Sequence, residues 1–435
     1  MRQAFSSQAP SRPMQPVRPL ALLPWLFIIA SLLAGSAAAQ ITFRPIKLLP
    51  PPPDELIALT SGANHNCVAR RDGMVLCWGR NSSGELGIGT SRSDWCGSFF
   101  CATLPTRLAT DVTGAAFSST RVSAGWDHSC ALDSTGATLC WGANGNSQTG
   151  VPSWAQVWLP TAAAAGKRFT AISAGNQTTC AVEPSATWCW GLLNTGAPGT
   201  PTLNGDQTMA VLVRTLTPTA ILPSSANFQA VSVGSMHACM QTSVSGFNDV
   251  NCIGRNDFGE LGYPPSLGPA FVIFGSTFGR PVGAPSSRAT FTCVDRLSNG
   301  TVACAGQNTY GMLGNGNNAD SGNAVVVGGG MALAGVAAGW THACAIDPQQ
   351  RAWCWGYNGW GQLGNGNAVS SNTPVLVGGG TVKFRAVAAG YQHTCGIATD
   401  NKVYCWGIND AGQLGRGYST SFDWLPRTAA GPFRM

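Results

Sequence analysis

The stretch that decides the fold reads AAGWTHACAID over residues 337–347 and WCWGYNGWGQLG over residues 353–364. The same pattern returns over 388–415, where HTCGI is followed by CWGINDAGQLG, and over 61–87. Seven copies can be traced along the chain, although the third and fifth lack parts of the pattern. Self-similarity at such a period predicts one structural unit repeated seven times.

Each copy carries two cysteines, nine to thirteen residues apart. Two further cysteines, five residues apart, lie between the first and second copies, so none of the sixteen is left over. This arithmetic predicts eight local disulfides, with each repeated pair lying across a hairpin. The expected pairs are Cys67 with Cys77, Cys96 with Cys101, Cys130 with Cys140, Cys180 with Cys189, Cys239 with Cys252, Cys293 with Cys304, Cys344 with Cys354, and Cys395 with Cys405.

Short alternating runs separated by Gly, Asn, Asp and Pro clusters are typical of strands and turns. No copy holds a long apolar stripe at helical spacing, so three or four strands per copy predict a propeller blade. The chain is therefore expected to be an all-β, seven-bladed β-propeller over residues 56–427. A C-terminal strand near 424–430 is expected to complete the blade that begins near Ile57, which would remove the open edge.

The order, spacing and number of these copies resemble the regulator of chromosome condensation repeat family, a family of seven-bladed propellers. The resemblance covers about residues 56–427. The paired cysteines depart from the nuclear founding member and resemble cysteine-bearing receptor ectodomain versions. The family's nucleotide-exchange activity is not expected here, because none of the loop residues that carry it can be matched.

The first 39 residues have the composition of a secretory signal peptide, with three arginines, an apolar run and AAA before Gln40. An uncleaved membrane anchor is the alternative. A proline-rich spacer at 40–55 and a tail at 428–435 would flank the propeller. Paired cysteines fit export, so we expect a secreted protein or one in the cell envelope, in the periplasm or at the cell surface.

The net charge is +6, and loss of the leader removes three arginines and no acid, which leaves +3. Such a weak and scattered charge argues against nucleic acid as a partner. No phosphate-binding or metalloprotease motif is present, and no cofactor is expected.

All five histidines stand two residues before the first cysteine of a copy, at His65, His128, His237, His342 and His393. This spacing would put a histidine and two cysteines near one another as metal ligands. Two copies keep the cysteines without the histidine, however, so no metal site is expected. We predict instead a structural histidine that bonds to the backbone of its own blade. The tryptophans of CWG are expected to pack between blades.

Aromatic residues at positions that differ between copies are the candidates for contact with a partner, because a scaffold should repeat and a binding site should not. Aromatic side chains carry much of the binding energy at interfaces. Loop packing alone would be the other explanation. The candidates are Trp95, Phe99, Phe100, Trp126, Trp340, Trp360 and Tyr391.

Three of these candidates belong to SDWCGSFFC at 93–101, the clearest insertion among the copies. The insertion is expected either to fold back on the propeller or to anchor a partner.

The preferred function is a non-enzymatic extracellular binding module for a protein or glycan, acting as a monomer. The alternative is a propeller-based hydrolase or lyase that acts on an extracellular polymer. Catalysis should place an acid, base or nucleophile at one spot outside the repeat, and every histidine lies in a repeated position.

Overall fold

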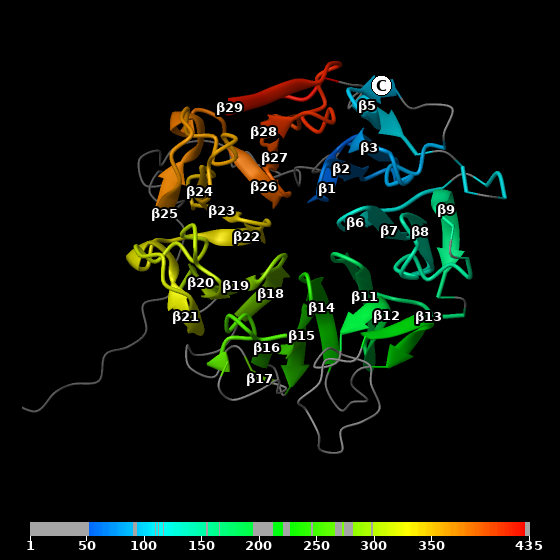
Figure 1. The fold of residues 1–435 in the computed structure, drawn as a ribbon, viewed down its shortest axis with the longest axis horizontal. Helices are drawn as coiled ribbons and strands as arrows, with labels where there is room; N and C mark the ends of the chain where they lie inside the picture. The colour runs from blue at the N-terminus through cyan, green and yellow to red at the C-terminus, as the bar shows by residue number, and fades with distance from the viewer. Residues whose placement is uncertain are drawn as a thin grey trace, which may run out of the picture. The chain divides into compact units, whose positions relative to one another are not determined.

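The computed structural model describes residues 52–430, apart from gaps at 90–93, 109, 112, 116, 154, 165, 195–211, 221–226, 245–246, 266–271, 274–281 and 297–298. Within these residues, seven antiparallel sheets stand in a ring around a common axis (Figure 1). The predicted all-β, seven-bladed propeller is therefore confirmed. The predicted leader and most of the predicted spacer lie outside the described residues.

Each blade is built from consecutive strands, beginning at the axis. The innermost strands are β1 (Leu56–Ser61), β6 (Arg121–Ala124), β10 (Ala171–Ala174), β14 (Asn227–Val233), β18 (Val282–Ser287), β22 (Ala334–Ala338) and β26 (Phe384–Ala389). The second strands are β2 (His65–Arg70), β7 (His128–Leu132), β11 (Thr178–Glu183), β15 (His237–Val244), β19 (Phe291–Arg296), β23 (His342–Ile346) and β27 (His393–Ala398).

The outer half of each blade follows the same order. The third strands are β3 (Val75–Arg80), β8 (Thr138–Gly142), β12 (Ala186–Asn194), β16 (Phe247–Gly254), β20 (Thr301–Gly306), β24 (Ala352–Gly356) and β28 (Val403–Asn409). The fourth strands are β5 (Phe99–Arg107), β9 (Val157–Ala163), β13 (Leu212–Ala220), β17 (Val272–Ile273), β21 (Ser321–Val326), β25 (Ser371–Leu376) and β29 (Thr420–Thr428). β4 (Asp94–Cys96) is a fifth strand in blade one, and 3₁₀ turns η2 (Val327–Gly329) and η3 (Val377–Gly380) follow β21 and β25.

The predicted closure by a C-terminal strand is wrong. β29 pairs with β28 and is the outer strand of blade seven, while β1 pairs with β2 in blade one. The proline segments end the blades because proline, which lacks an N–H, is tolerated on edge strands. The ring closes instead through hydrogen bonds between blades one and seven: Trp78 Nε1 and Asn66 Nδ2 of blade one donate to the carbonyl oxygen of Gln413, at 3.0 and 2.8 Å.

The sixteen cysteines form the eight predicted disulfides. In each blade the bond joins directly opposed residues of the second and third strands, as in the register between β23 and β24. The bond therefore ties together the two central strands of the blade. The seven bonds of this kind are Cys67 with Cys77, Cys130 with Cys140, Cys180 with Cys189, Cys239 with Cys252, Cys293 with Cys304, Cys344 with Cys354, and Cys395 with Cys405. The eighth, Cys96 with Cys101, joins β4 to β5.

An asparagine builds the loop that follows the third strand in six of the copies. In blade six, Asn358 Oδ1 accepts the N–H of Leu363 at 2.9 Å, and its Nδ2 donates to the carbonyl oxygen of Asn367 at 2.9 Å. The following Gly364 has φ +65°, and a Cβ there would lie 2.6 Å from Nε1 of Trp406 in the next blade. The N-x-x-G-x-L-G pattern therefore shapes a loop against which the neighbouring tryptophan packs, as predicted for these tryptophans.

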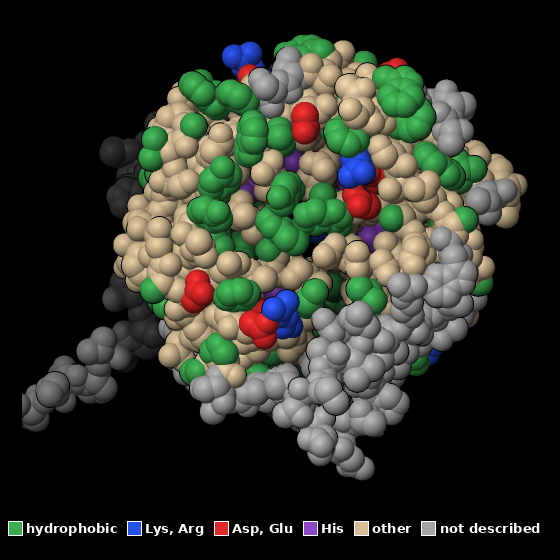
Figure 2. All heavy atoms as spheres, in the orientation of Figure 1, with side chains coloured by type: hydrophobic (Ala, Val, Ile, Leu, Met, Phe, Trp, Pro, Cys, Tyr) green, Lys and Arg blue, Asp and Glu red, His purple; other side chains and the backbone are tan. Residues whose placement is uncertain are grey.

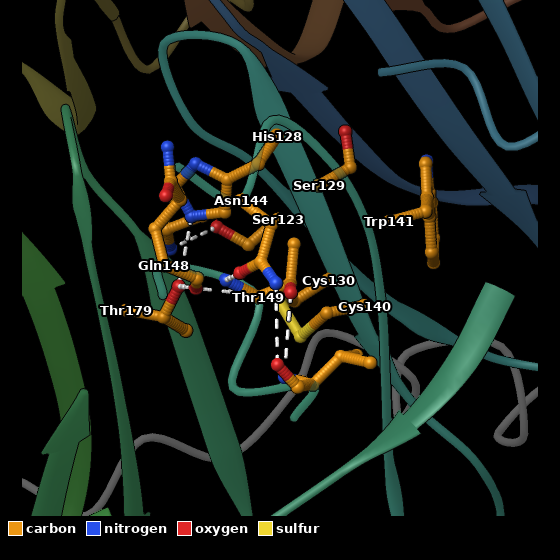
Figure 3. Close-up of a disulfide and its surroundings, with 12 residues drawn as sticks. Ser123, His128, Ser129, Cys130, Cys140, Trp141, Asn144, Gln148, Thr149 and Thr179 are labelled. Atoms are coloured by element: carbon orange, nitrogen blue, oxygen red, sulfur yellow. Dashed lines mark hydrogen bonds between the residues drawn. A yellow bond between two sulfur atoms is a disulfide. The ribbon is translucent and has the colours of Figure 1, made fainter. Parts of the chain in front are cut away.

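The five histidines join neighbouring blades, and the predicted bond to the backbone of the same blade is wrong. His342 Nε2 lies 2.8 Å from Thr394 Oγ1 in blade seven, and that hydroxyl donates to the carbonyl oxygen of Gln362. The hydroxyl proton is thus used, so His342 Nε2 carries the proton and donates to the hydroxyl. Figure 3 shows the same arrangement in blade two, where His128 points at Thr179, 2.8 Å away.

Each histidine bonds to a residue of the next copy of the repeat. In that copy, the partner directly follows the position that is equivalent to the histidine. That residue is Ser129, Thr179, Thr292, Thr394 or Asn66 after the five histidine-bearing copies. The two copies without a histidine carry Thr178 and Phe291, and the next blade then has a buried alanine, Ala238 or Ala343. Donor and acceptor therefore appear and disappear together.

We expect the His342→Phe and Thr394→Ala substitutions to couple. Phenylalanine alone should leave the Thr394 hydroxyl without its donor, and alanine alone should leave Nε2 without its acceptor, each costing about 1–3 kcal/mol. The double variant recreates the Phe291–Ala343 pairing and should recover about 1 kcal/mol or more. Urea unfolding of the four proteins measures this coupling, and strictly additive losses would contradict the pairing.

The buried histidines also predict acid instability. Burial lowers the pKa of His128, His342 and His393 to about 3 and of His237 to about 4, and it lowers that of His65 well below 6.5. Unfolded histidines bind protons below about pH 6.5. The unfolded state thus takes up more protons, so stability should fall as the pH drops from about 6.5 towards 4.

Burial acts in the opposite direction on four carboxyls: it raises the pKa of Glu85 and Glu260 to about 7, and it raises that of Asp127 and Asp295 above its usual range. The stability that these protonated carboxyls contribute is lost as the pH rises through their folded pKa, but the five histidines outnumber the four carboxyls between about pH 4.5 and 6.5. Melting temperatures measured across this range should show maximal stability near pH 6.5. The double variant of His342 and Thr394 should have a shallower slope than the wild type, and an equal slope would contradict the assignment.

Candidate binding face

Three predicted contact residues meet at the axis of the ring. Trp126, Trp340 and Tyr391 each follow the end of an innermost strand, in blades two, six and seven. Their ring centroids are 4.5, 5.2 and 5.7 Å apart, with edge-to-face geometry, and all three side chains are half-buried. We call these residues the axial cluster. Figure 2 shows hydrophobic side chains gathered near the centre of the face in view.

Small residues let the rings converge. Gly62, Gly125, Gly175, Gly234, Gly339 and Gly390 immediately precede this slot. A Cβ on Gly339 would lie 2.7 Å from the carbonyl oxygen of Gly390 in the next blade. The glycines are therefore required by close approach of neighbouring backbones.

The space beneath the axial cluster is almost filled. A cavity of about 10 Å³ remains between the rings and Arg288, which occupies the glycine position in blade five. This volume holds one water molecule at most. The cluster is accordingly a contact surface and not the mouth of a small-molecule pocket.

The insertion in blade one forms a hairpin of β4 and β5, which we call the blade-one hairpin. Its Trp95 and Phe100 rings are 4.4 Å apart and remain 68% and 39% exposed. The hairpin extends the sheet by one strand and leaves these rings accessible. An exposed aromatic pair held by the Cys96–Cys101 disulfide is a second candidate, after the axial cluster, for a contact with a partner.

Arg80 links the blade-one hairpin to the axial cluster. Its guanidinium lies 5.1 Å from the centroid of Phe99 and 3.4 Å from Asp127, the residue that follows Trp126. Arg80 also lies 3.7 Å from Glu85. Burial raises the pKa of both acids, although Arg80 opposes that shift. Both aromatic groups therefore belong to the face where the third strands end.

Trp360 is not brought to the axial cluster. Its ring lies 6.2 Å from Phe422, which stacks on Trp424 at 5.6 Å. Trp424 and Leu425 are 44% and 45% exposed on β29, and the sequence prediction missed them because it considered this strand only as the one that completes blade one. The sequence did carry a signal for this exposed surface, because Tyr418, Phe422 and Trp424 lie within seven residues of one another.

The histidines take no part in this face. All five side chains are at most 3% exposed, and each Nε2 is bonded to the next blade. Within the described residues, no three histidine, cysteine or acidic side chains are grouped as metal ligands. In the same part of the chain, no helix has the length and apolar character needed to cross a membrane.

Two family models, both described as regulator of chromosome condensation (RCC1) repeat, match the chain. One matches residues 57–85, 120–148, 334–362 and 384–413, and the other matches 72–132 and 350–397. The chain carries RCC1 repeats. The matched segments include the first, second, sixth and seventh blades, where the sequence pattern is fullest.

A curated relative with RCC1 repeats is the mitochondrial RCC1 domain-containing protein RUG3 of Arabidopsis thaliana, 27% identical over 197 residues. The match covers 43% of this chain and 40% of RUG3, so it spans less than half of that relative. Among solved structures, human WBSCR16 is similar with a TM-score of 0.69 and 17% identity, over 82% of this chain and 94% of that one.

Prp20p of Saccharomyces cerevisiae is also similar, with a TM-score of 0.65 and 18% identity over 87% of this chain and 88% of its own. Prp20p binds Gsp1p and histones. At these identities the two structures support the RCC1-type fold. They do not transfer their partners to this chain.

Proposed function

We propose that the chain is a non-enzymatic binding module that recognises a protein partner outside the reducing cytosol. The observation that carries the proposal is the position of the axial cluster: three rings from three blades converge on one half-buried apolar surface at the axis. The blade-one hairpin adds an exposed aromatic pair on the same face. Protein interfaces are built around such aromatic anchors with a polar rim.

A protein suits this surface better than a glycan. The three rings use their edges and faces on one another, so little ring face is left for stacking on a sugar. The small cavity beneath them cannot admit a monosaccharide. RCC1-type propellers with this fold include a protein binder, Prp20p, which supports the class of function and leaves the partner open.

An oxidising compartment is part of the proposal. Eight disulfides in one chain fit secretion or the cell envelope, since cytosolic thiols are kept reduced. The predicted leader agrees with this placement, whereas RUG3 is a mitochondrial protein. Fractionation of the native host, with detection of the mature N-terminus, tests cleavage and export together.

Capture from the native host's envelope and secreted fractions tests the binding proposal. The bait is the mature propeller, compared with a variant that carries Trp126→Ala and Trp340→Ala. Trp353→Ala is the matched control, because Trp353 is the second residue of β24 and so lies near the end of blade six that is remote from Gly356. A partner retained by the control and lost by the double variant supports the face. A partner retained equally by all three contradicts it.

A further inference from the structure

A second cavity lies inside the ring, on the other side of Arg288 from the axial cluster. It measures about 250 Å³ and is lined by residues of all seven innermost strands. Thr60, Ser123, Ser173, Ser232 and Ser286 supply hydroxyls from five blades. Arg288 is the one charged residue among the described residues that line it. The proposed protein-binding face does not use this cavity.

Arg288 breaks the repeat in a way that places a positive charge in the channel. Its side chain leaves blade five and reaches the opposite blades, where Nη1 donates to the carbonyl oxygens of Ala124 at 3.0 Å and Ala174 at 3.5 Å. Within the described residues, no carboxylate pairs with this guanidinium. A guanidinium presents its donors as a planar fork that matches an oxyanion.

The hydroxyls of Ser123 and Ser173 are available as donors. Ser123 Oγ accepts the N–H of Ala174 at 2.9 Å, and Ser173 Oγ accepts the N–H of Val233 at 3.1 Å. These bonds use oxygen lone pairs, so the hydroxyl protons remain free to point into the cavity. Ser123 and Ser173 directly precede Ala124 and Ala174, which hold the guanidinium.

The charge of Arg288 persists at neutral pH. Burial lowers its pKa to about 10, so the guanidinium stays protonated. Burial, followed by the charge of Arg288, also lowers the pKa of His128. A cation in a cavity without a counterion favours a bound anion.

We propose that the central channel binds one small oxyanion, of carboxylate or tetrahedral type, through Arg288 with hydroxyl donors from Ser123 and Ser173. The cavity is large enough for such an anion. Six of the seven copies carry glycine in place of Arg288, so the site is a feature of blade five alone. It is separate from the proposed protein-binding face.

The test is calorimetric titration of sodium sulfate and sodium acetate at constant ionic strength. Arg288→Gln should weaken binding about ten-fold or more, because it removes the charge-assisted hydrogen bonds. Arg288→Lys should retain part of the affinity, since it keeps the charge without the fork. Arg255→Gln is the control, because Arg255 is an exposed arginine paired with Asp257. If Arg288→Gln does not fold, Arg288→Gly replaces it with the residue of the other copies.

Crystals soaked in selenate provide an independent readout by anomalous scattering. A single peak beside the Arg288 guanidinium, absent from Arg288→Gln, supports the site. Tighter sulfate would indicate a tetrahedral anion, and tighter acetate would indicate a carboxylate. Equal binding by wild type and Arg288→Gln, no measurable binding of either anion, or selenate at surface sites only would overturn the proposal.

Discussion

Full reduction of the disulfides should unfold the protein at temperatures where the oxidised protein stays folded. Closing a loop of about ten residues contributes ~2–3 kcal/mol in the chain-entropy model. Seven such loops, one in each blade, together match or exceed the ~5–15 kcal/mol by which ordinary domains are stable. Scanning calorimetry with and without a reductant, with thiol counting, measures this loss.

The eighth disulfide supplies the control. Cys96 and Cys101 join β4 to β5 outside the central strands of the blade. Serine at both positions should therefore shift the melting temperature far less than serine at Cys344 and Cys354. Intact mass should show the oxidised chain lighter by one hydrogen for each of its 16 cysteines. A fully reduced protein that melts at the temperature of the oxidised one would contradict the account.

Alanine in the axial cluster should cause the largest loss of partner affinity. Trp126→Ala, Trp340→Ala and Tyr391→Ala should each cost about 2 kcal/mol or more, which is roughly thirty-fold in Kd. The reason is that half-buried aromatic anchors lose both contact area and the ring that orients its neighbour. Surface plasmon resonance with the captured partner measures the change.

Trp353→Ala and His342→Ala separate binding from stability. Trp353 lies at the opposite end of blade six, so its loss should leave affinity unchanged. His342→Ala removes a bond between blades, so the melting temperature should fall while the folded fraction binds as before. If His342→Ala abolishes binding in a folded protein and the cluster variants bind normally, scaffold and site have been assigned the wrong way round.

The repeated sequence motifs predicted the number of blades, the disulfide pairs and the packing of tryptophans between blades. Each of these depends on spacing within one copy. The position at which one blade ends and the next begins was not predictable in the same way, because a repeat of four strands can be divided at any of its loops. β29 was consequently placed in blade one, although it belongs to blade seven.

The candidate site was predicted only in part. Trp126, Trp340 and Tyr391 were recognised as breaks in the repeat, but their meeting at the axis depends on ring geometry. Trp360 was grouped with them, although its partners are on β29. The histidine bonds could have been predicted from the sequence. Wherever a copy lacks the histidine, the next copy has alanine in place of the residue that would bond to it. Arg288 stands where the other six copies have glycine, and only the closed ring shows that it enters the channel.

Hydrogen–deuterium exchange of the propeller with and without its captured partner tests the central claim most directly. The partner should slow exchange at the loops around Trp126, Trp340 and Tyr391 and in the blade-one hairpin at 94–100. The hairpin turns between second and third strands, such as 347–351, should exchange at the same rate in both samples. Protection confined to those turns, with none around the axial cluster, would contradict the assignment of the binding face.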